Sequence, residues 1–246
     1  MISRLIEFIL PRIIGIMVHK RETLSEKEQV AQGAFIAKID IKKRKTEQPV
    51  IVAIVGLVGS GKSSVAKGLA ERIGASIVEG DDIRIELRRQ HERYERARAI
   101  AENVVLEVVK QGGNAILDSD FVDEKKRASL REKARRAGIR LVFIRTHCDL
   151  DVMVGRALAA HYRDRVDDFF GGASSKWTGN EQSKGAAVKV REMWRRTPHH
   201  YRWVSQVGGK WVLKKLPFAV FAEIDTTDSD QWKRTVEQCA KKLLAS

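Results

Sequence analysis

A glycine-rich segment that begins at residue 50, V-I-V-A-I-V-G-L-V-G-S-G-K-S-S, contains the residues whose spacing points most directly to chemistry. It matches the pattern G-x-x-x-x-G-K-[ST] at all four fixed positions. Glycine lets backbone N–H groups wrap around a phosphate, the lysine contacts the β- and γ-phosphates, and the hydroxyl binds Mg²⁺. The segment therefore predicts a nucleotide-binding loop with Ser63 as the metal ligand. Its residues are Gly56, Gly59, Ser60, Gly61, Lys62, Ser63 and Ser64.

The elements around this segment are those that such a loop requires. The run before it is rich in β-branched residues and suits a strand that is buried on both faces. An amphipathic helix is expected at residues 62–73, with its positive N-terminal end directed at the phosphates and Gly74 at its C-terminal end. A tight glycine turn that binds nothing is the alternative, and this context disfavours it.

A second group of polar residues, E-G-D-D-I-R, follows the strand that is expected at residues 75–78. The carboxyl ends of parallel strands meet at the edge of the sheet where ligands bind. Phosphoryl transfer needs a carboxylate that orients or deprotonates the attacking hydroxyl, and Asp81 is the candidate for this role. Arg84 follows on the same side of the next helical turn, where it can bind an anionic acceptor.

The pieces G-S-G-K-S and G-D-D-I-R together resemble the P-loop kinases with an AAA-type ATP-binding domain. This group includes phage-type polynucleotide kinase, adenylylsulfate kinase, gluconate kinase and the zeta-toxin-like kinases. The resemblance covers about residues 50–165. It implies that ATP and Mg²⁺ are bound, that Asp81 is the base or orienting carboxylate, and that Arg84 contacts the acceptor.

The same resemblance implies a role for Asp118, which closes the apolar strand A-I-L-D. An aspartate at this place in the group faces the acceptor or a magnesium-bound water, so Asp118 is expected to bind substrate. The alternative is that Asp118 caps the helix that is expected to begin near Asp123.

Arginines that form a lid over the triphosphate, commonly spaced R-x-x-x-R, are also implied by the resemblance. The candidates are Arg156, expected to bind nucleotide, and Arg163, expected to act in catalysis together with Lys62 and Asp81. Ala160 stands four residues after Arg156, so the chain departs from the spacing of the group. A basic helix end beside its last carbonyls is the electrostatic alternative.

The fold that must position these residues is predicted to be a three-layer α/β domain of the P-loop NTPase type. Five parallel strands, the last at residues 218–225, have helices on both faces, and a closing helix runs from about residue 230 to 244. This domain is expected to comprise residues 49–246, with the lid and a basic insertion at about residues 156–216.

Residues 1–48 are expected to form a helical extension. Thr23 and Ser25 each precede a glutamate by three residues, which is the capping-box pattern for a helix that runs towards Ile41. The basic run at residues 42–45 is expected to be a solvated linker. Residues 1–20 have a broad apolar face but are too interrupted for a membrane span or a signal peptide. They are expected to dock on the domain or a second copy, or to attach to a membrane surface or partner.

The composition bounds the location and the partners of the protein. The chain has 246 residues, 43% of them apolar, which is enough for a core of its own. Its two cysteines have no spacing for a disulfide framework or a zinc site, which favours a reducing, cytoplasmic setting. Forty-six Lys and Arg against 32 Asp and Glu give a net charge of +14, which favours anionic partners.

Within the insertion, residues 189–203 interleave arginines with two tryptophans and a tyrosine. This mixture is typical of a surface for single-stranded nucleic acid. The alternative, which we favour slightly, is that the aromatic side chains are core anchors and that the charges form a solvated face. Nucleic acid is therefore kept as a second partner beside ATP and a hydroxyl-bearing acceptor.

The combined prediction is an enzyme that transfers the γ-phosphoryl group of ATP to a hydroxyl of a small molecule. A polynucleotide 5′-hydroxyl kinase and a non-enzymatic ATP-binding switch or scaffold are the alternatives. The preference for adenine follows from the resemblance, and no N-K-x-D pattern of guanine-binding proteins is present.

Overall fold

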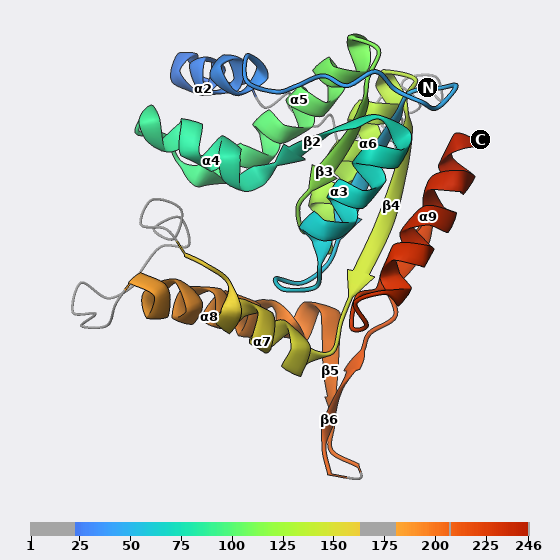
Figure 1. The fold of residues 1–246 in the computed structure, drawn as a ribbon. Coiled ribbons are helices and arrows are strands. Elements are labelled where there is room, and N and C mark those ends of the chain that lie inside the picture. The colour runs from blue at the N-terminus through green and yellow to red at the C-terminus, as the bar shows by residue number, and fades with distance from the viewer. Residues whose placement is uncertain (1–22, 163–180, 207, 246) are drawn as a thin grey trace, which may run out of the picture.

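The computed structural model describes residues 23–162, 181–206 and 208–245, and its centre is a five-stranded sheet (Figure 1). The strands lie in the order β2-β3-β1-β4-β7, and every pairing between them is parallel. This is the predicted sheet. Its strands are β1 (Val50–Val55), β2 (Ala75–Glu79), β3 (Asn114–Asp118), β4 (Arg140–His147) and β7 (Ala222–Asp225).

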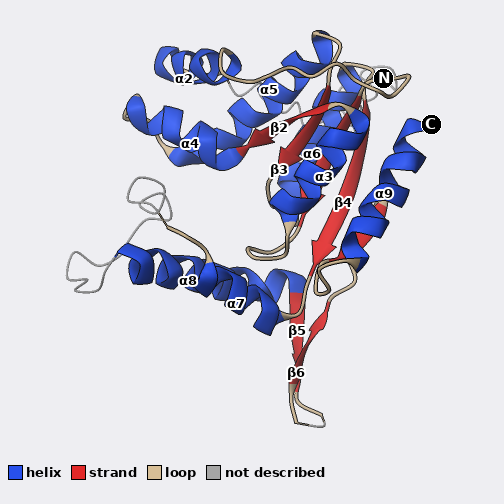
Figure 2. Ribbon diagram, in the orientation of Figure 1, coloured by secondary structure: helices blue, strands red, loops and turns tan. Residues whose placement is uncertain are grey.

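Helices pack on both faces of this sheet, as predicted (Figure 2). Strand β1 is buried along its whole length because its alternate residues enter two different apolar clusters. One cluster includes residues of α3 and α9, and the other includes residues of α2, α4, α5 and α6. The helices around the sheet are α2 (Glu26–Ile36), α3 (Lys62–Ile73), α4 (Gly80–Arg89), α5 (Ala97–Lys110), α6 (Glu124–Arg136), α7 (Leu150–Ala159) and α9 (Gln231–Leu244), with a short 3₁₀ turn at Tyr94–Arg96.

The N-terminal extension packs against the domain through α2. Ser25 and Glu28 form the predicted capping box, and Phe35 enters the apolar cluster of α5. Helix α2 ends at Ile36 and not near Ile41, so the predicted helix is too long. Residues 1–20, for which docking or membrane attachment was predicted, lie outside the described residues. Within the described residues, no helix has the length and apolar character needed to cross a membrane.

The basic run at residues 42–45 is largely exposed, as predicted, but it is also hydrogen-bonded to the domain. Lys45 donates from its backbone N–H to the carbonyl of Ile73 at 3.0 Å, and its Nζ donates to the carbonyl of Glu71 at 2.8 Å. Arg44 donates to the carbonyl of Gly112 at 2.8 Å. These carbonyls lie at the C-terminal ends of α3 and α5, where helices leave acceptors unsatisfied.

The described part of the insertion has regular secondary structure. Its first element is a helix, α8 (Glu181–His200). An antiparallel hairpin, β5 (Tyr201–Val204) with β6 (Lys210–Leu213), follows it and was not predicted. Conversely, the predicted last strand at residues 218–225 is a strand only from Ala222 onward, and Phe218 packs edge-on against Phe143.

Candidate active site

A cleft of about 530 Å³ lies at the carboxyl ends of β1, β2 and β3. It brings together residues that are far apart in the sequence and that come from the phosphate-binding loop, α4, β3 and α7. The predicted site residues that line it are Gly56, Gly59, Lys62, Ser63, Asp81, Arg84, Asp118 and Arg156. Ser60, Gly61 and Ser64 belong to the loop and to the start of α3 but do not line the cleft, and Arg163 lies outside the described residues.

The phosphate-binding loop depends on glycine at several positions. Gly59 and Gly61 adopt φ angles of 83° and 77°, a region that other residues rarely adopt. A Cβ atom at Gly56 would lie 2.3 Å from Oγ1 of Thr146. The buried hydroxyl of Ser60 hydrogen-bonds the same Thr146 atom at 2.8 Å. The loop is thereby held against β4, with its backbone facing the cleft.

Lys62 and Ser63 begin α3. The side chain of Lys62 turns back to the phosphate-binding loop, and the side chain of Ser63 reaches the end of β3. Lys62 Nζ donates to the carbonyl of Leu57 at 3.0 Å, which folds the side chain back across the loop. Ser63 Oγ donates to Oδ2 of Asp118 at 2.7 Å. A hydroxyl beside a carboxylate is the kind of oxygen donor set that Mg²⁺ prefers, so these residues fit that ion. Asp118 does not cap α6, because Asp123 accepts that cap bond from the N–H of Lys125.

Asp81 and Arg84 lie in the first turns of α4, on the opposite side of the cleft from the loop. Their side chains are paired through Arg84 Nη1 and Asp81 Oδ1, and both line the cleft. The neighbouring Asp82 does not line it. Burial, together with the negative charges of Asp81 and Glu86, raises the pKa of Asp82 above its usual value. Of these two adjacent aspartates, Asp81, the one that the sequence analysis selected, lines the cleft.

Glu79 is a cleft residue that the sequence analysis missed. It ends β2 and lies in register with Asp118 on the adjacent strand β3. Burial, followed by the negative charges of Asp82 and Asp118, raises the pKa of Glu79. Its place at the start of E-G-D-D could have indicated it, because it is the last strand residue before the glycine.

Asp120 is the second missed residue, and it connects the cleft to α8. Its Oδ2 lies 3.2 Å from Nε2 of the buried His200 and 3.8 Å from Nη1 of Arg196. Burial alone would raise the pKa of Asp120, but the hydrogen bond with His200 and the charges of His200 and Lys62 hold it below its usual value. His200 therefore has a carboxylate partner, and no group of three or more His, Cys, Asp or Glu suited to a metal occurs among the described residues. Lys189 and Arg196 line the cleft, so α8 forms part of its wall.

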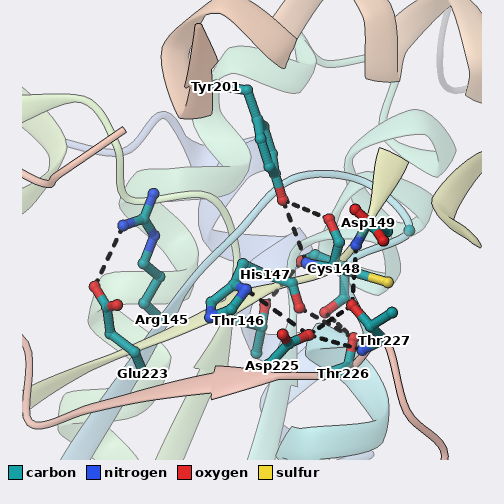
Figure 3. Close-up of polar contacts among 12 residues, drawn as sticks. Arg145, Thr146, His147, Cys148, Asp149, Tyr201, Glu223, Asp225, Thr226 and Thr227 are labelled. Carbon is teal, nitrogen blue, oxygen red and sulfur yellow. Dashed lines mark hydrogen bonds and ion pairs between the residues drawn. The ribbon is translucent and has the colours of Figure 1, made fainter. Parts of the chain in front are cut away.

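Arg156, the described lid candidate, binds the phosphate-binding loop and the end of β7. Its Nη1 donates to the carbonyl of Gly59 at 3.3 Å and to Oγ1 of Thr226 at 3.0 Å, and its Nη2 donates to the carbonyl of Thr226 at 2.5 Å. Thr226 and Thr227 follow β7 beside Asp225 and Asp149 (Figure 3).

Tyr201 fixes the root of the β5–β6 hairpin to the end of β4 (Figure 3). Its hydroxyl donates to the carbonyl of Cys148 at 2.7 Å and accepts from the N–H of the same residue at 3.3 Å. Burial raises the pKa of Tyr201 to about 12. The predicted role of the aromatic residues as core anchors is confirmed for Tyr201. It is wrong for Trp194 and Trp203, which are 45% and 55% exposed.

Comparison with known proteins agrees with this geometry. Residues 51–169 match the AAA domain family. An uncharacterized protein of Mycobacterium tuberculosis is 30% identical over 127 residues, which cover 44% of this chain and 25% of that protein. The chain thus spans about a quarter of the length of this relative.

Two solved structures share the fold. The APS kinase of Mycobacterium tuberculosis, in complex with AMPPNP and APS, has a TM-score of 0.51 and 18% identity, and the alignment covers 81% of this chain and 99% of that one. The protein APE1195 has a TM-score of 0.51 and 17% identity, with 81% and 97% covered. The chain therefore has a P-loop kinase-like fold, and its residues 51–169 match the AAA domain family.

Proposed function

We propose that the protein is an ATP-dependent phosphotransferase that moves the γ-phosphoryl group of ATP to a hydroxyl of a small molecule. The observation that carries this proposal is a single cleft with Lys62 and Ser63 on one side and the paired Asp81 and Arg84 on the other. A phosphate donor and a hydroxyl acceptor can therefore be held against each other between these two groups.

In this proposal the loop N–H groups and Lys62 hold the β- and γ-phosphates of ATP. The acceptor oxygen forms a bond to the γ-phosphorus while the bond from that phosphorus to the bridging oxygen of ADP breaks. Asp81 receives the proton that the hydroxyl loses, and Arg84 orients the carboxylate and the acceptor. Arg156 stabilises charge from the Gly59 side of the loop.

Ser63 and Asp118 are the residues that would hold magnesium. When bound, the ion neutralises charge on the phosphate oxygens. Asp118 orients the Ser63 hydroxyl, and this arrangement does not depend on the identity of the acceptor.

A small acceptor is favoured because the cleft has walls on several sides. Arg84 approaches from α4, while Lys189 and Arg196 approach from α8, and the volume of about 530 Å³ is typical of a small-molecule site. The same basic side chains of α8 support the second candidate, a kinase for polynucleotide 5′-hydroxyl groups. The third candidate is an ATP-binding switch or scaffold that has no acceptor.

We assign residues 49–246 to the kinase domain and residues 1–48 to the N-terminal extension. A cytoplasmic location suits an ATP-dependent enzyme in which Cys148 and Cys239 are both free and buried.

The test is transfer of label from γ-labelled ATP to a panel of hydroxyl compounds and to oligonucleotides with 5′-hydroxyl ends. Asp81→Asn should lower kcat by about 10²–10⁴-fold and leave ATP affinity unchanged. Asp82→Asn is the matched control, because Asp82 is adjacent but does not line the cleft, and it should leave kcat near the wild-type value.

The outcomes separate the three candidates. Labelled small molecules support the proposal, whereas salt-sensitive labelling of oligonucleotide ends supports the polynucleotide kinase. ATP binding without any labelled product, from the wild type or from Asp81→Asn, contradicts both kinase proposals and supports the ATP-binding switch or scaffold.

A further inference from the structure

The stretch between Glu192 and Glu223 has an unusual charge pattern. Residues 193–222 contain no Asp or Glu, although 32 such residues occur in the whole chain. The same stretch contains six basic residues, Arg195, Arg196, Arg202, Lys210, Lys214 and Lys215. It includes the end of α8 and the whole β5–β6 hairpin, and it therefore favours contact with a polyanion.

Three tryptophans form an aromatic cluster on this stretch. Trp203 of β5 and Trp211 of β6 are cross-strand partners with ring centroids 5.5 Å apart, and Trp194 of α8 lies 6.1 Å from Trp211. Trp194 and Trp203 are among the few large hydrophobic side chains that are exposed in the described part of the chain, and the others are Val30 and Leu158. The aromatic surface is therefore local and is not part of a general apolar face.

The hairpin presents this cluster away from the domain. It extends from the end of α8, beyond the five-stranded sheet (Figure 1). Tyr201 and Leu213, paired at its base, belong to the apolar cluster of α7 and α8, and the Tyr201 hydroxyl is bound to Cys148. The base is thus anchored, while Trp203 lies further along the same face of the hairpin.

The cations on the hairpin are available to a ligand. Within the described residues, the side chains of Arg202 and Lys210 take part in no hydrogen bond or ion pair, and both residues are exposed. Arg195 on α8 differs, because its Nε and Nη2 donate to the two carboxylate oxygens of Glu192. Successive strand residues alternate between faces, so Arg202 and Lys210 lie on the face of the hairpin opposite to Trp203 and Trp211. A single strand that crosses the edge of this two-stranded hairpin can stack bases on one face while its phosphates meet the cations on the other.

We propose that the β5–β6 hairpin, with Trp194, Trp203, Arg202 and Lys210, binds single-stranded nucleic acid. A lipid surface fits the patch less well, because the exposed apolar residues here are two tryptophans without exposed Leu, Ile or Phe around them. The proposal is independent of the phosphotransferase activity, since none of these four residues lines the cleft.

The experiment is fluorescence anisotropy of a labelled oligothymidylate, and of a matching oligouridylate, of about 12 nucleotides. The full chain is titrated in saturating Mg²⁺ and AMPPNP, so that the phosphate-binding loop does not compete for the probe. Trp203→Ala should weaken binding roughly five- to hundredfold, which is the cost of losing one stacked base.

A second variant, Arg202→Gln with Lys210→Gln, leaves the aromatic cluster in place and keeps the test valid if Trp203→Ala does not fold. It should make the slope of log K against log salt shallower by about 1.4, because each lost phosphate contact contributes about 0.7. Lys233→Gln with Lys241→Gln is the matched control, since it removes the same charge from exposed positions on α9 and should leave the slope unchanged.

Several results would overturn the proposal. The first is that neither oligonucleotide binds. The second is that the hairpin variant and the α9 variant weaken oligonucleotide binding equally. The third is binding of phosphatidylglycerol vesicles that an excess of oligonucleotide does not displace. Self-association of the chain that Trp203→Ala abolishes, without oligonucleotide binding, would assign the patch to a second copy instead. None of these measurements depends on turnover, so failure here leaves the proposed kinase activity untouched.

Discussion

Ser63 Oγ donates a hydrogen bond of 2.7 Å to Oδ2 of Asp118, which joins the first turn of α3 to the carboxyl end of β3. Ser63 follows β1 through the phosphate-binding loop, and Asp118 ends β3. The strands β1 and β3 are hydrogen-bonded neighbours in the sheet. The pairing fixes the direction of the serine hydroxyl, the group that the loop pattern offers to magnesium. Asp118 is consequently a positioning residue whatever the acceptor is.

Asp118→Ala should therefore weaken magnesium binding more than nucleotide binding. Loss of a partner that orients a metal ligand typically costs ten- to hundredfold in metal affinity. The measurement is a titration of Mg²⁺ at fixed ATP, followed through turnover and through nucleotide affinity. Asp123→Ala is the control, because it removes the same group from the cap of α6 and should lower stability without changing magnesium affinity. Superimposable magnesium curves for Asp118→Ala and wild type would contradict this role.

Gly56→Ala and Gly33→Ala should have opposite effects on stability. A Cβ at Gly56 would lie 2.3 Å from Thr146 Oγ1 and 2.8 Å from the Thr146 carbonyl, so the loop must shift, at a cost of about 1–3 kcal/mol. A Cβ at Gly33 in α2 meets nothing within 4 Å, and alanine there should gain about 0.5–1 kcal/mol. Denaturant unfolding with and without ATP measures both effects. Retention of wild-type ATP affinity in Gly56→Ala would show that the loop tolerates the shift.

The loop and the sheet were predictable because their determinants are local. The β-branched run of β1, the loop glycines and the Gly74 helix end are each encoded within a few residues. Since parallel strands end at one edge, the sequence also placed Asp81 and Asp118 near the loop without any knowledge of distances.

The rest of the site depends on contacts that no local pattern encodes. Asp120 belongs to the site because α8 brings His200 and Arg196 to it from about 80 residues further along the chain. The hairpin was missed because a Gly-Gly pair after a short aromatic strand also fits an irregular loop. The basic run at residues 42–45 seemed free for the same reason, because its acceptors are helix-end carbonyls elsewhere in the fold.

Glu79 should make stability depend on pH in a specific direction. Burial and the charges of Asp82 and Asp118 raise its pKa in the folded state, so the folded protein holds this proton more tightly than the unfolded chain. The resulting stabilisation is present at low pH and is lost as the pH rises through the folded-state pKa. Glu79→Gln should therefore raise Tm relative to wild type at about pH 8, and the difference should shrink towards pH 4.5, the ordinary pKa.

Thermal unfolding across this pH range tests the Glu79 prediction. Glu71→Gln, at an exposed position on α3, controls for the loss of a surface charge. A Tm difference for Glu79→Gln that stays constant with pH, or grows as the pH falls, would contradict the assigned direction.

Glu102 should be the most costly carboxylate to remove on α5. It is fully buried and accepts from Arg98 at 2.9 Å, from Lys133 at 2.8 Å and from Ser129 at 2.7 Å. It thereby ties α5 to α6 on the sheet face below the cleft. Glu102→Ala leaves these donors without their acceptor and should lower the free energy of unfolding by about 3–5 kcal/mol. Glu107→Ala on the same helix removes an exposed pair with Lys110, 3.7 Å away, and an exposed hydrogen bond from Gln111 at 3.1 Å, and it should change the free energy of unfolding by less than about 0.5 kcal/mol. Chemical denaturation compares the two variants directly, and losses of similar size would show that the buried network adds nothing beyond a surface ion pair.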